Sequence, residues 1–357
     1  MKEKKKIIKK LALSKIKGSY YKLNYAITSK CNSRCRTCNV WKDYLKNPKI
    51  ADNDLSLEEI TRIFSKLPGD IFWLSLSGGE PFLRDDLAQI CQAAVEKIPS
   101  LSLISIPSNG LLENIILEKT KKILQSPLPN LFLNFSLDGP EKIHDQIRGI
   151  SGAFRKTWST YGKVLQLTRR DPRLAVNLET TISQYNINYL EDFFRKLVKN
   201  GHKITVTIAH SGYLYKNIKD DKKFTKLNNG KRIERIIEIV KTSLSPFSPV
   251  DLIERAYLSR IPEYYLNRKK KPLSCTALRS SFALDPKGQI TPCFMWDYSL
   301  GNIKDFDYNF KKFFEKKRKE ILKAKKLIEN GFCPNCWTPC EAYQSIIQGM
   351  MDLKVFI

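Results

Sequence analysis

Apolar residues follow two alternating patterns through the N-terminal part of the chain. Short apolar runs of the kind that form buried strands lie at 23–29, 71–77, 102–107, 131–136, 175–181 and 204–209. Longer segments, whose apolar residues recur every three or four positions as in helices, lie at 56–67, 85–98, 111–124, 154–169 and 190–200. Six strands that alternate with helices predict a parallel α/β sheet, either a partial barrel or a doubly wound sheet.

The pattern changes after this region. Residues 216–272 are Lys-rich and contain two helical patterns, at 233–243 and 252–266, which predicts a helical linker. A second module is expected over 273–357. It opens with a predicted hairpin that turns at residues 286–288, Pro-Lys-Gly.

Three cysteines lie close together directly after the first predicted strand. Cys31, Cys35 and Cys38 stand in the spacing C-x3-C-x2-C. A structural zinc site takes four ligands, usually from two C-x2-C pairs, and no second pair lies within 50 residues. Three thiolates from one loop instead suit three irons of a [4Fe-4S] cluster, which leaves the fourth iron open to a small ligand. This loop is the first candidate for a chemical site.

Three more polar turns follow predicted strands. The turn GGEP at 78–81 ends the second strand, Ser-Asn-Gly at 108–110 follows the third, and SLDGP at 136–140 ends the fourth. In parallel α/β sheets, ligands collect where the carboxyl ends of the strands meet. These turns and the cysteine loop are therefore expected to converge on one site.

A second group of cysteines lies near the C-terminus. Its five members are Cys275, Cys293, Cys333, Cys336 and Cys340. The first two stand in the pattern C-x12-G-x4-C around the predicted hairpin, and the last three in C-x2-C-x3-C. These spacings suit a metal centre better than a core, and a zinc ribbon is one alternative. Cys91 stands alone in a helical pattern and is expected in the core.

The cysteine loop and the GGEP turn together resemble the radical S-adenosylmethionine (radical SAM) superfamily. The C-terminal cysteines, with the Gly301-Asn302 pair after the hairpin, are similar to the auxiliary iron–sulfur domains of the SPASM and twitch group. The resemblance implies a partial (β/α)6 TIM-like barrel over 23–215, followed by a small C-terminal auxiliary-cluster domain. Residues 1–22 would form a basic N-terminal extension.

The resemblance also implies roles for the residues of the first site. Cys31, Cys35 and Cys38 would hold a [4Fe-4S] cluster whose open iron is chelated by S-adenosyl-L-methionine. The turn glycines Gly78 and Gly79 would admit the methionine part of that ligand, because they carry no side chain, and Glu80 would bind its ammonium group.

Other turn residues are assigned in the same way. Ser136 and Asp138 match the SxDG segment of many family members, with Ser136 placed at the ligand carboxylate or ribose and Arg148 at the carboxylate. Arg148 is equally compatible with a surface ion pair to Asp145, and His144 is expected on a helix surface. Ser108 and Asn109 suit either the polar edge of the ligand or an ordinary turn.

The C-terminal cysteines depart from the full SPASM pattern, which has seven cysteines for two clusters. Five cysteines imply one auxiliary [4Fe-4S] cluster. Cys275, Cys293 and Cys333 are the expected ligands, and either Cys336 or Cys340 completes the set.

Charge and composition restrict the setting of this chemistry. The formal net charge is +26, with nine lysines in 1–22 and nine basic residues in 311–326. These segments predict either an anionic partner or only a solvated Lys-rich face. No apolar run is long enough for a transmembrane segment or an export signal, so a cytoplasmic protein is expected, where nine cysteines indicate metal or redox chemistry.

The expected activity follows from the resemblance. Such an enzyme takes an electron from a donor such as flavodoxin or ferredoxin, cleaves S-adenosylmethionine to a 5′-deoxyadenosyl radical, and abstracts a substrate hydrogen. We expect oxidation or cross-linking of a peptide or protein side chain. A radical SAM dehydrogenase or a cofactor- or lipid-biosynthesis enzyme acting on a small molecule is one alternative. A non-catalytic iron–sulfur protein that binds nucleic acid is another.

Overall fold

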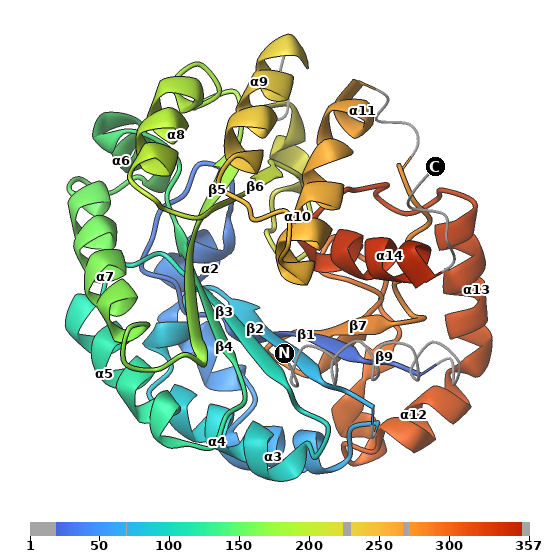
Figure 1. Ribbon diagram of the computed structural model, residues 1–357. Helices are drawn as coiled ribbons and strands as arrows, with labels where there is room; N and C mark the ends of the chain where they lie inside the picture. The colour runs from blue at the N-terminus through green and yellow to red at the C-terminus, as the bar shows by residue number, and fades with distance from the viewer. Residues whose placement is uncertain (1–18, 69, 224–229, 267–270, 352–357) are drawn as a thin grey trace.

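The computed structural model describes residues 19–68, 70–223, 230–266 and 271–351. Its centre is one sheet in the strand order β6-β5-β4-β3-β2-β1-β7-β8-β9 (Figure 1). The first six strands are β1 (Lys22–Thr28), β2 (Trp73–Gly78), β3 (Leu103–Ser108), β4 (Leu131–Ser136), β5 (Leu174–Ile182) and β6 (Ile204–Ile208). They are parallel and lie side by side in chain order, which confirms the six predicted strands.

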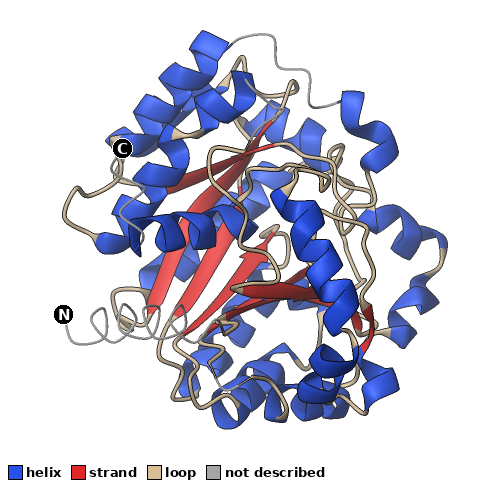
Figure 2. Ribbon diagram, turned by 90° about the vertical axis from the view of Figure 1, so that its right-hand side faces the viewer, coloured by secondary structure: helices blue, strands red, loops and turns tan. Residues whose placement is uncertain are grey.

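Helices connect these strands and pack around the outside of the sheet (Figures 1 and 2). The outer helices are α3 (Leu57–Ser65), α4 (Leu87–Lys97), α5 (Glu113–Gln125), α7 (Ala153–Leu167), α8 (Leu190–Lys199) and α9 (Gly230–Lys241). Each begins and ends within a few residues of its predicted bounds. At the start of α3, Ser56 and Glu59 form a capping box, in which each side chain accepts a hydrogen bond from the other residue's amide.

Shorter helices complete the connections. They are α2 (Val40–Lys46), α6 (Glu141–Arg148), α10 (Pro249–Ser259), α11 (Ile261–Leu266), α12 (Phe310–Lys316), α13 (Arg318–Glu329) and α14 (Pro339–Met351). The single helix predicted over 252–266 is wrong, since α10 ends before Arg260 and α11 starts anew. Pro262 contributes to the break, because it lacks an amide hydrogen and cannot continue the hydrogen bonds of α10.

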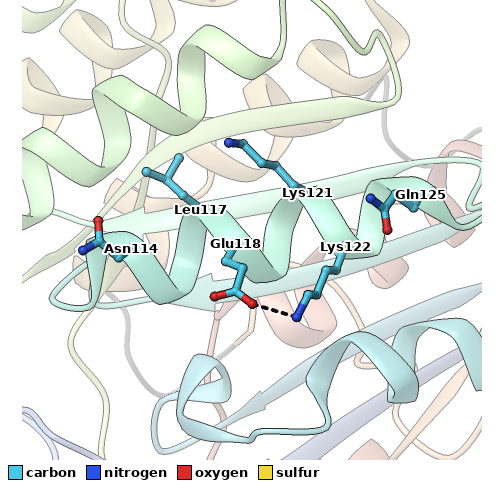
Figure 3. Close-up of a pocket in the computed structure, with 6 residues that line it drawn as sticks. All are labelled: Asn114, Leu117, Glu118, Lys121, Lys122 and Gln125. Carbon is cyan, nitrogen blue, oxygen red and sulfur yellow. Dashed lines mark ion pairs between the residues drawn. The ribbon is translucent and has the colours of Figure 1, made fainter.

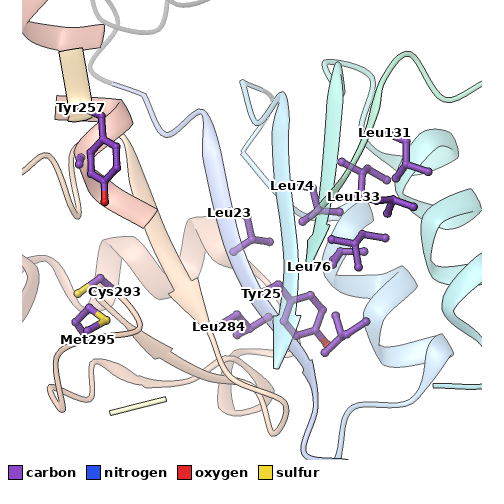
Figure 4. Close-up of a cluster of buried hydrophobic side chains, with 14 of the residues drawn as sticks. Leu23, Tyr25, Leu74, Leu76, Leu131, Leu133, Tyr257, Leu284, Cys293 and Met295 are labelled. Atoms are coloured by element: carbon purple, nitrogen blue, oxygen red, sulfur yellow. The ribbon is translucent and has the colours of Figure 1, made fainter. Parts of the chain in front are cut away.

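The main core lies between the sheet and the outer helices (Figure 4). On β5, buried residues alternate with partly exposed ones, so that Leu174, Val176 and Leu178 face the helices and Glu179 faces the opposite, inner side. The same alternation holds on β4. The inner face of the sheet is therefore more polar than the outer face, and it is the face available to a ligand.

The C-terminal strands extend the same sheet. They are β7 (Ser281–Leu284), β8 (Gln289–Thr291) and β9 (Gly301–Asn302). β7 pairs in parallel with β1, and β7 and β8 form the predicted antiparallel hairpin. The sequence did not predict the pairing of β7 with β1.

Helix α14 lies against the inner face of β1 and β7. Lys22 Nζ donates to the carbonyl oxygen of Cys340 at 2.8 Å, and the buried carboxylate of Glu341 accepts from Asn24 Nδ2 at 3.1 Å and from Ser281 Oγ at 2.6 Å. The two halves of the chain therefore share one interior, with α14 against the amino-terminal part of β1.

Part of the expected organisation lies outside the described residues. This applies to most of the basic extension 1–22, whose described part starts at residue 19, and to most of the Lys-rich run 268–272. Within the described ranges, no helix has the length and apolar character needed to cross a membrane.

Candidate functional site

The cysteine loop starts where β1 ends and is tied to the turn after β2. The Gly79 amide donates to the Thr28 carbonyl at 2.9 Å, and the Glu80 amide donates to the Lys30 carbonyl at 2.7 Å. The contact is so close that a Cβ atom on Gly79 would lie 2.0 Å from the Lys30 oxygen and 3.0 Å from Cβ of Cys31. Gly79 is therefore required for the approach of the two turns.

The other side of the cysteine loop is held by the end of α6. Backbone amides of Arg34 and Arg36 donate to the carbonyls of Arg148 and Ile147, both at 2.9 Å. Gly149 follows with φ +66°, and a Cβ atom there would lie 2.6 Å from the Arg34 carbonyl. The loop is thus held between the β2 turn and the end of α6 by contacts within the chain.

The thiol of Cys35 lies among polar groups. Its sulfur is 3.1 Å from Ser33 Oγ and 3.6 Å from Arg148 Nη1. The indole nitrogen of Trp41 donates to the carbonyls of Cys35 and Cys38, which holds the loop's backbone in place. Burial raises the pKa of Cys38 to about 12 and raises that of Cys31 further.

This donor set fits an iron–sulfur cluster. Thiolates are the ligands of such clusters, and cationic and hydrogen-bonding groups beside the sulfur, here Arg148 and Ser33, stabilise their negative charge. Among the described residues, no three Cys, His, Asp or Glu side chains converge as they would around one metal ion. A cluster does not require that convergence, because each thiolate binds a different iron.

Three predicted residues meet at one buried carboxylate. Glu80 is 1% exposed and accepts hydrogen bonds from Ser108 Oγ at 3.0 Å and from the Asn109 amide at 2.7 Å. Asn109 Nδ2 in turn donates to Asn32 Oδ1 of the cysteine loop at 2.7 Å. Burial raises the pKa of Glu80 to about 7, although these donors act in the opposite direction. Such a carboxylate is suited to a cationic ligand group that restores its charge.

The SLDGP segment forms the next part of the site. Asp138 is 2% exposed, and its carboxylate lies 2.8 Å from Arg148 Nε. The alternative prediction of a surface ion pair between Arg148 and Asp145 is therefore wrong. The Asp145 carboxylate instead accepts hydrogen bonds from the backbone amides of Gly152 and Phe154. The expected surface position of His144 is also wrong. His144 is fully buried, and its Nδ1 accepts from the Asp138 amide at 3.0 Å.

One interior residue was missed by the sequence interpretation. Glu179 on β5 is paired in register with Ser136 on β4, and both face the inner side of the sheet. Burial raises the pKa of Glu179, while nearby Arg148 acts to lower it. The signal was available, because Glu179 lies on the polar side of an otherwise regularly alternating strand.

The five C-terminal cysteines are linked electrostatically through Cys336. Its thiol interacts electrostatically with those of the other four. Cys333 Sγ accepts from Lys271 Nζ at 2.9 Å. Cys340 differs from the rest, because its strongest interactions are with Lys22, Glu341 and Glu179 on the inner side of the sheet.

One segment after β6 connects the two cysteine groups. The Leu214 amide donates to the Phe294 carbonyl beside Cys293 at 2.9 Å, while the Tyr215 carbonyl accepts from the Asn39 amide beside Cys38 at 2.8 Å. Burial raises the pKa of Tyr215 well above its usual value, and the thiols of Cys38, Cys336 and Cys340 act in the same direction. Tyr215 therefore lies between the two groups.

A further buried carboxylate faces this interior from α10. Glu254 Oε2 accepts a hydrogen bond from the Tyr343 hydroxyl of α14. The side-chain hydrogen bonds of Tyr343 and Thr205 act to lower the pKa of this carboxylate. Burial raises the pKa of Glu254 from 4.5 to about 7.

Glu254→Gln is expected to change how stability depends on pH. Between pH 4.5 and about 7, native Glu254 keeps a proton that the unfolded chain has released, so wild-type stability falls as the pH rises through this window. The variant cannot titrate there. Urea unfolding should show the variant gaining about 1 to 3 kcal/mol relative to wild type between about pH 5 and pH 8.5. A difference that stays constant with pH would contradict the assignment.

The outer surface offers a depression away from these groups. It is lined by Asn114, Leu117, Glu118, Lys121, Lys122 and Gln125, all from α5, with an ion pair between Glu118 and Lys122 (Figure 3). None of the predicted site residues lines it. The chemistry therefore belongs to the inner side of the sheet.

Two family profiles match the chain. Residues 25–197 match the radical SAM superfamily, and residues 275–337 match an iron–sulfur cluster-binding domain named SPASM. The two matched segments contain the two cysteine groups, except that Cys340 lies just beyond the second segment. The C-terminal match supports the auxiliary cluster that the cysteine spacing predicted.

Curated relatives match over different lengths. The antilisterial bacteriocin subtilosin biosynthesis protein AlbA of Bacillus subtilis is 22% identical over 78% of this chain and 56% of its own length. The PqqA peptide cyclase of Rhodopseudomonas palustris is 22% identical over 75% of this chain and 65% of its own. A GTP 3′,8-cyclase of Aquifex aeolicus is 29% identical over 37% of this chain and 40% of its own. The chain thus spans less than two thirds of these relatives.

Solved structures show the same fold. Native anSMEcpe with bound AdoMet aligns over 94% of this chain and 96% of its own, with TM-score 0.54 and 16% identity. The same protein with bound AdoMet and the Cp18Cys peptide aligns over 86% and 83%, with TM-score 0.55 and 16% identity. This likeness confirms the partial barrel with a C-terminal extension.

Proposed function

The chain belongs to the radical SAM superfamily and carries a C-terminal SPASM domain, and from this premise we propose that it cleaves S-adenosylmethionine reductively to modify a peptide. The cluster on Cys31, Cys35 and Cys38 would supply the electron for that cleavage when it is bound. The observation that carries the proposal is the approach of the cysteine loop to the buried Glu80 carboxylate, held by Gly79 and Asn109.

The residues of the chain divide the binding task. Glu80 is the candidate for the ligand's ammonium group, since it is a buried carboxylate beside the cysteine loop. Arg148 is the candidate for the ligand carboxylate, because its guanidinium lies between Cys35 and Asp138. Gly78 serves the turn itself, because a Cβ atom there would lie 2.4 Å from the Thr28 carbonyl oxygen, and Ser136 faces the inner side of the sheet from β4.

Activity can be tested without knowledge of the substrate. The protein is reconstituted anaerobically with iron and sulfide, then mixed with S-adenosylmethionine and dithionite. We expect 5′-deoxyadenosine and methionine in equal amounts, measured by mass spectrometry. Full iron loading without 5′-deoxyadenosine would refute the enzyme proposal.

A peptide is the favoured substrate class. The matches that reach both halves of this chain include AlbA and the PqqA peptide cyclase, whereas the GTP 3′,8-cyclase match covers 37% of it. A peptide encoded beside this gene should lose two hydrogen atoms on incubation with the reduced enzyme and S-adenosylmethionine. If that peptide is unchanged and a small molecule is oxidised instead, the substrate proposal is wrong while the enzyme proposal stands.

The auxiliary cluster is proposed to use Cys275, Cys293, Cys333 and Cys336. Cys336 is preferred to Cys340 as the fourth ligand because its thiol interacts electrostatically with those of Cys275 and Cys293, whereas the strongest interactions of Cys340 are with Lys22 and Glu341. Cys275, Cys293 and Cys333 are the three ligands that were expected from the sequence. The fifth thiol then faces the shared interior.

Two matched variants separate these cysteines. Cys336→Ala should lose the iron of one cluster, roughly half of the total. Cys340→Ala should keep the wild-type iron content, because its thiol is not needed as a ligand. Iron analysis and electron paramagnetic resonance of the reduced proteins measure both. The reverse result would assign Cys340 to the cluster.

A further inference from the structure

Helix α13 presents a basic stripe to solvent. Lys319, Lys323 and Lys326 are exposed and stand at helical spacing, with Leu322 between them at 49% exposure. The opposite side of the helix is buried through Ile321, Ala324 and Ile328. One side therefore anchors the helix, and the basic side is free to meet a partner.

The positive charge of this stripe is only partly offset nearby, by Glu320, which interacts electrostatically with Lys319. In the described ranges, no acidic side chain forms an ion pair with the three lysines, although Glu320 on the same helix pairs with Lys317. Three cations on one face create a positive field that attracts anionic surfaces and raises their association rate. The sequence placed nine basic residues in 311–326, and the structure puts these three on one exposed side of α13.

The stripe leads directly to the auxiliary cysteines. α13 ends at Glu329, and the amide of Phe332 donates to the Leu327 carbonyl at 2.9 Å, so the following loop folds back on the helix. Phe332 is 71% exposed, and the next residue is Cys333. Cys333 accepts from Lys271, so a further cation lies at this end.

An exposed aromatic residue beside a basic stripe is typical of a protein-binding surface. Large apolar side chains in the open are used as contact anchors, and charges around them select and orient the partner. A membrane surface would require a broader apolar face than Leu322 and Phe332 provide. The neighbouring cluster cysteine gives such a partner a specific purpose.

We propose that α13 and Phe332 form the docking surface for an acidic electron-transfer protein that exchanges electrons with the auxiliary cluster through its Cys333 side. The proposal depends on the proposed function for the existence of that cluster. The reduced partner's flavin or iron–sulfur centre loses one electron, the auxiliary [4Fe-4S] cluster gains it, and no bond is formed or broken. Cys333 is the point of entry because both of its chain neighbours, Phe332 and Pro334, are exposed.

The test compares two triple charge reversals. The docking variant is Lys319→Glu, Lys323→Glu and Lys326→Glu. The control is Arg195→Glu, Lys196→Glu and Lys199→Glu on the exposed side of α8, which changes the net charge equally and lies across the molecule (Figure 1). Reduced acidic [2Fe-2S] ferredoxin is mixed anaerobically with each reconstituted protein, and cluster bleaching is followed by stopped flow.

The docking variant should lose at least about tenfold in the second-order rate constant at low salt, and the control should stay within about twofold of wild type. Added salt should slow wild type and leave the docking variant nearly unchanged. Phe332→Ser should slow the reaction without removing its salt dependence. Equal rates for the docking variant and the control would overturn the proposal.

Dithionite separates this proposal from the proposed function. It is a small reductant that needs no protein docking surface, so 5′-deoxyadenosine formation with dithionite should be the same in all variants. If wild type forms none, the enzyme proposal fails, while the ferredoxin rates still decide the docking surface. If the docking variant alone loses the dithionite reaction, its defect is not in docking and the proposal is wrong.

Discussion

Cys35→Ala is expected to reduce S-adenosylmethionine cleavage to background. Three thiolates from one loop must hold three irons of the cluster. Removal of the Cys35 thiolate leaves one of these irons without its protein ligand. Cys35 is the member whose sulfur contacts both Ser33 and Arg148, so its loss also removes the contact between the cluster ligand and the guanidinium. The variant should keep roughly half of the wild-type iron, held by the C-terminal cysteines.

Cys91→Ala is the matched control for this change. Cys91 is fully buried in α4 among apolar residues, as its sequence pattern predicted, and takes no part in either cysteine group. The control should keep both the iron content and the rate of 5′-deoxyadenosine formation, although it loses some core packing. Wild-type cleavage by Cys35→Ala would remove the basis for placing the chemistry at this loop.

The sequence predicted the six parallel strands because their apolar runs are regular, whereas the barrel was implied by the family resemblance. β4 begins and ends at the predicted residues, and each polar turn that joins the site follows a strand of one parallel sheet. This rule alone brings Glu80, Ser108 and Asn109 together, since neighbouring parallel strands end at the same edge. The convergence of these three residues therefore required no knowledge of tertiary contacts.

The parts that were not predicted depend on contacts between distant segments. His144 and Ile147 are both buried on α6, but local spacing does not reveal that the helix covers a loop. Arg148 had two acidic neighbours in sequence, and only the structure shows that Asp145 is occupied by amides of the next turn. The pairing of β7 with β1 joins segments about 260 residues apart, which no local pattern encodes.

The shared interior follows from that unpredicted pairing. Because β7 extends the sheet beyond β1, α14 lies over the inner face of both strands, and Cys340 interacts electrostatically with Glu179 of β5. Tyr215 lies between the two cysteine groups in the same space. Under the proposed function, the position of Tyr215 between the two cysteine groups suits a reaction that removes both a hydrogen atom and an electron.

Gly79→Ala, which adds one methyl group to the GGEP turn, is expected to disrupt the neighbouring first cluster site. The new Cβ would lie 2.0 Å from the Lys30 carbonyl oxygen, and the backbone cannot move aside while the Gly79 and Glu80 amides stay bonded to Thr28 and Lys30. The cysteine loop must therefore shift. We expect a loss of about 2 kcal/mol or more in unfolding free energy, with loss of first-cluster iron and of S-adenosylmethionine cleavage.

Gly162→Ala isolates the effect of position from that of the added methyl group. Gly162 lies inside α7, and nothing stands within 4 Å of an added Cβ. Alanine there should stabilise the protein by about 0.5 to 1 kcal/mol, because glycine loses more backbone entropy in a helix. Urea unfolding and iron analysis of the two variants measure the contrast. Retention of full iron and activity by Gly79→Ala would mean that the close approach of the GGEP turn does not position the cysteine loop.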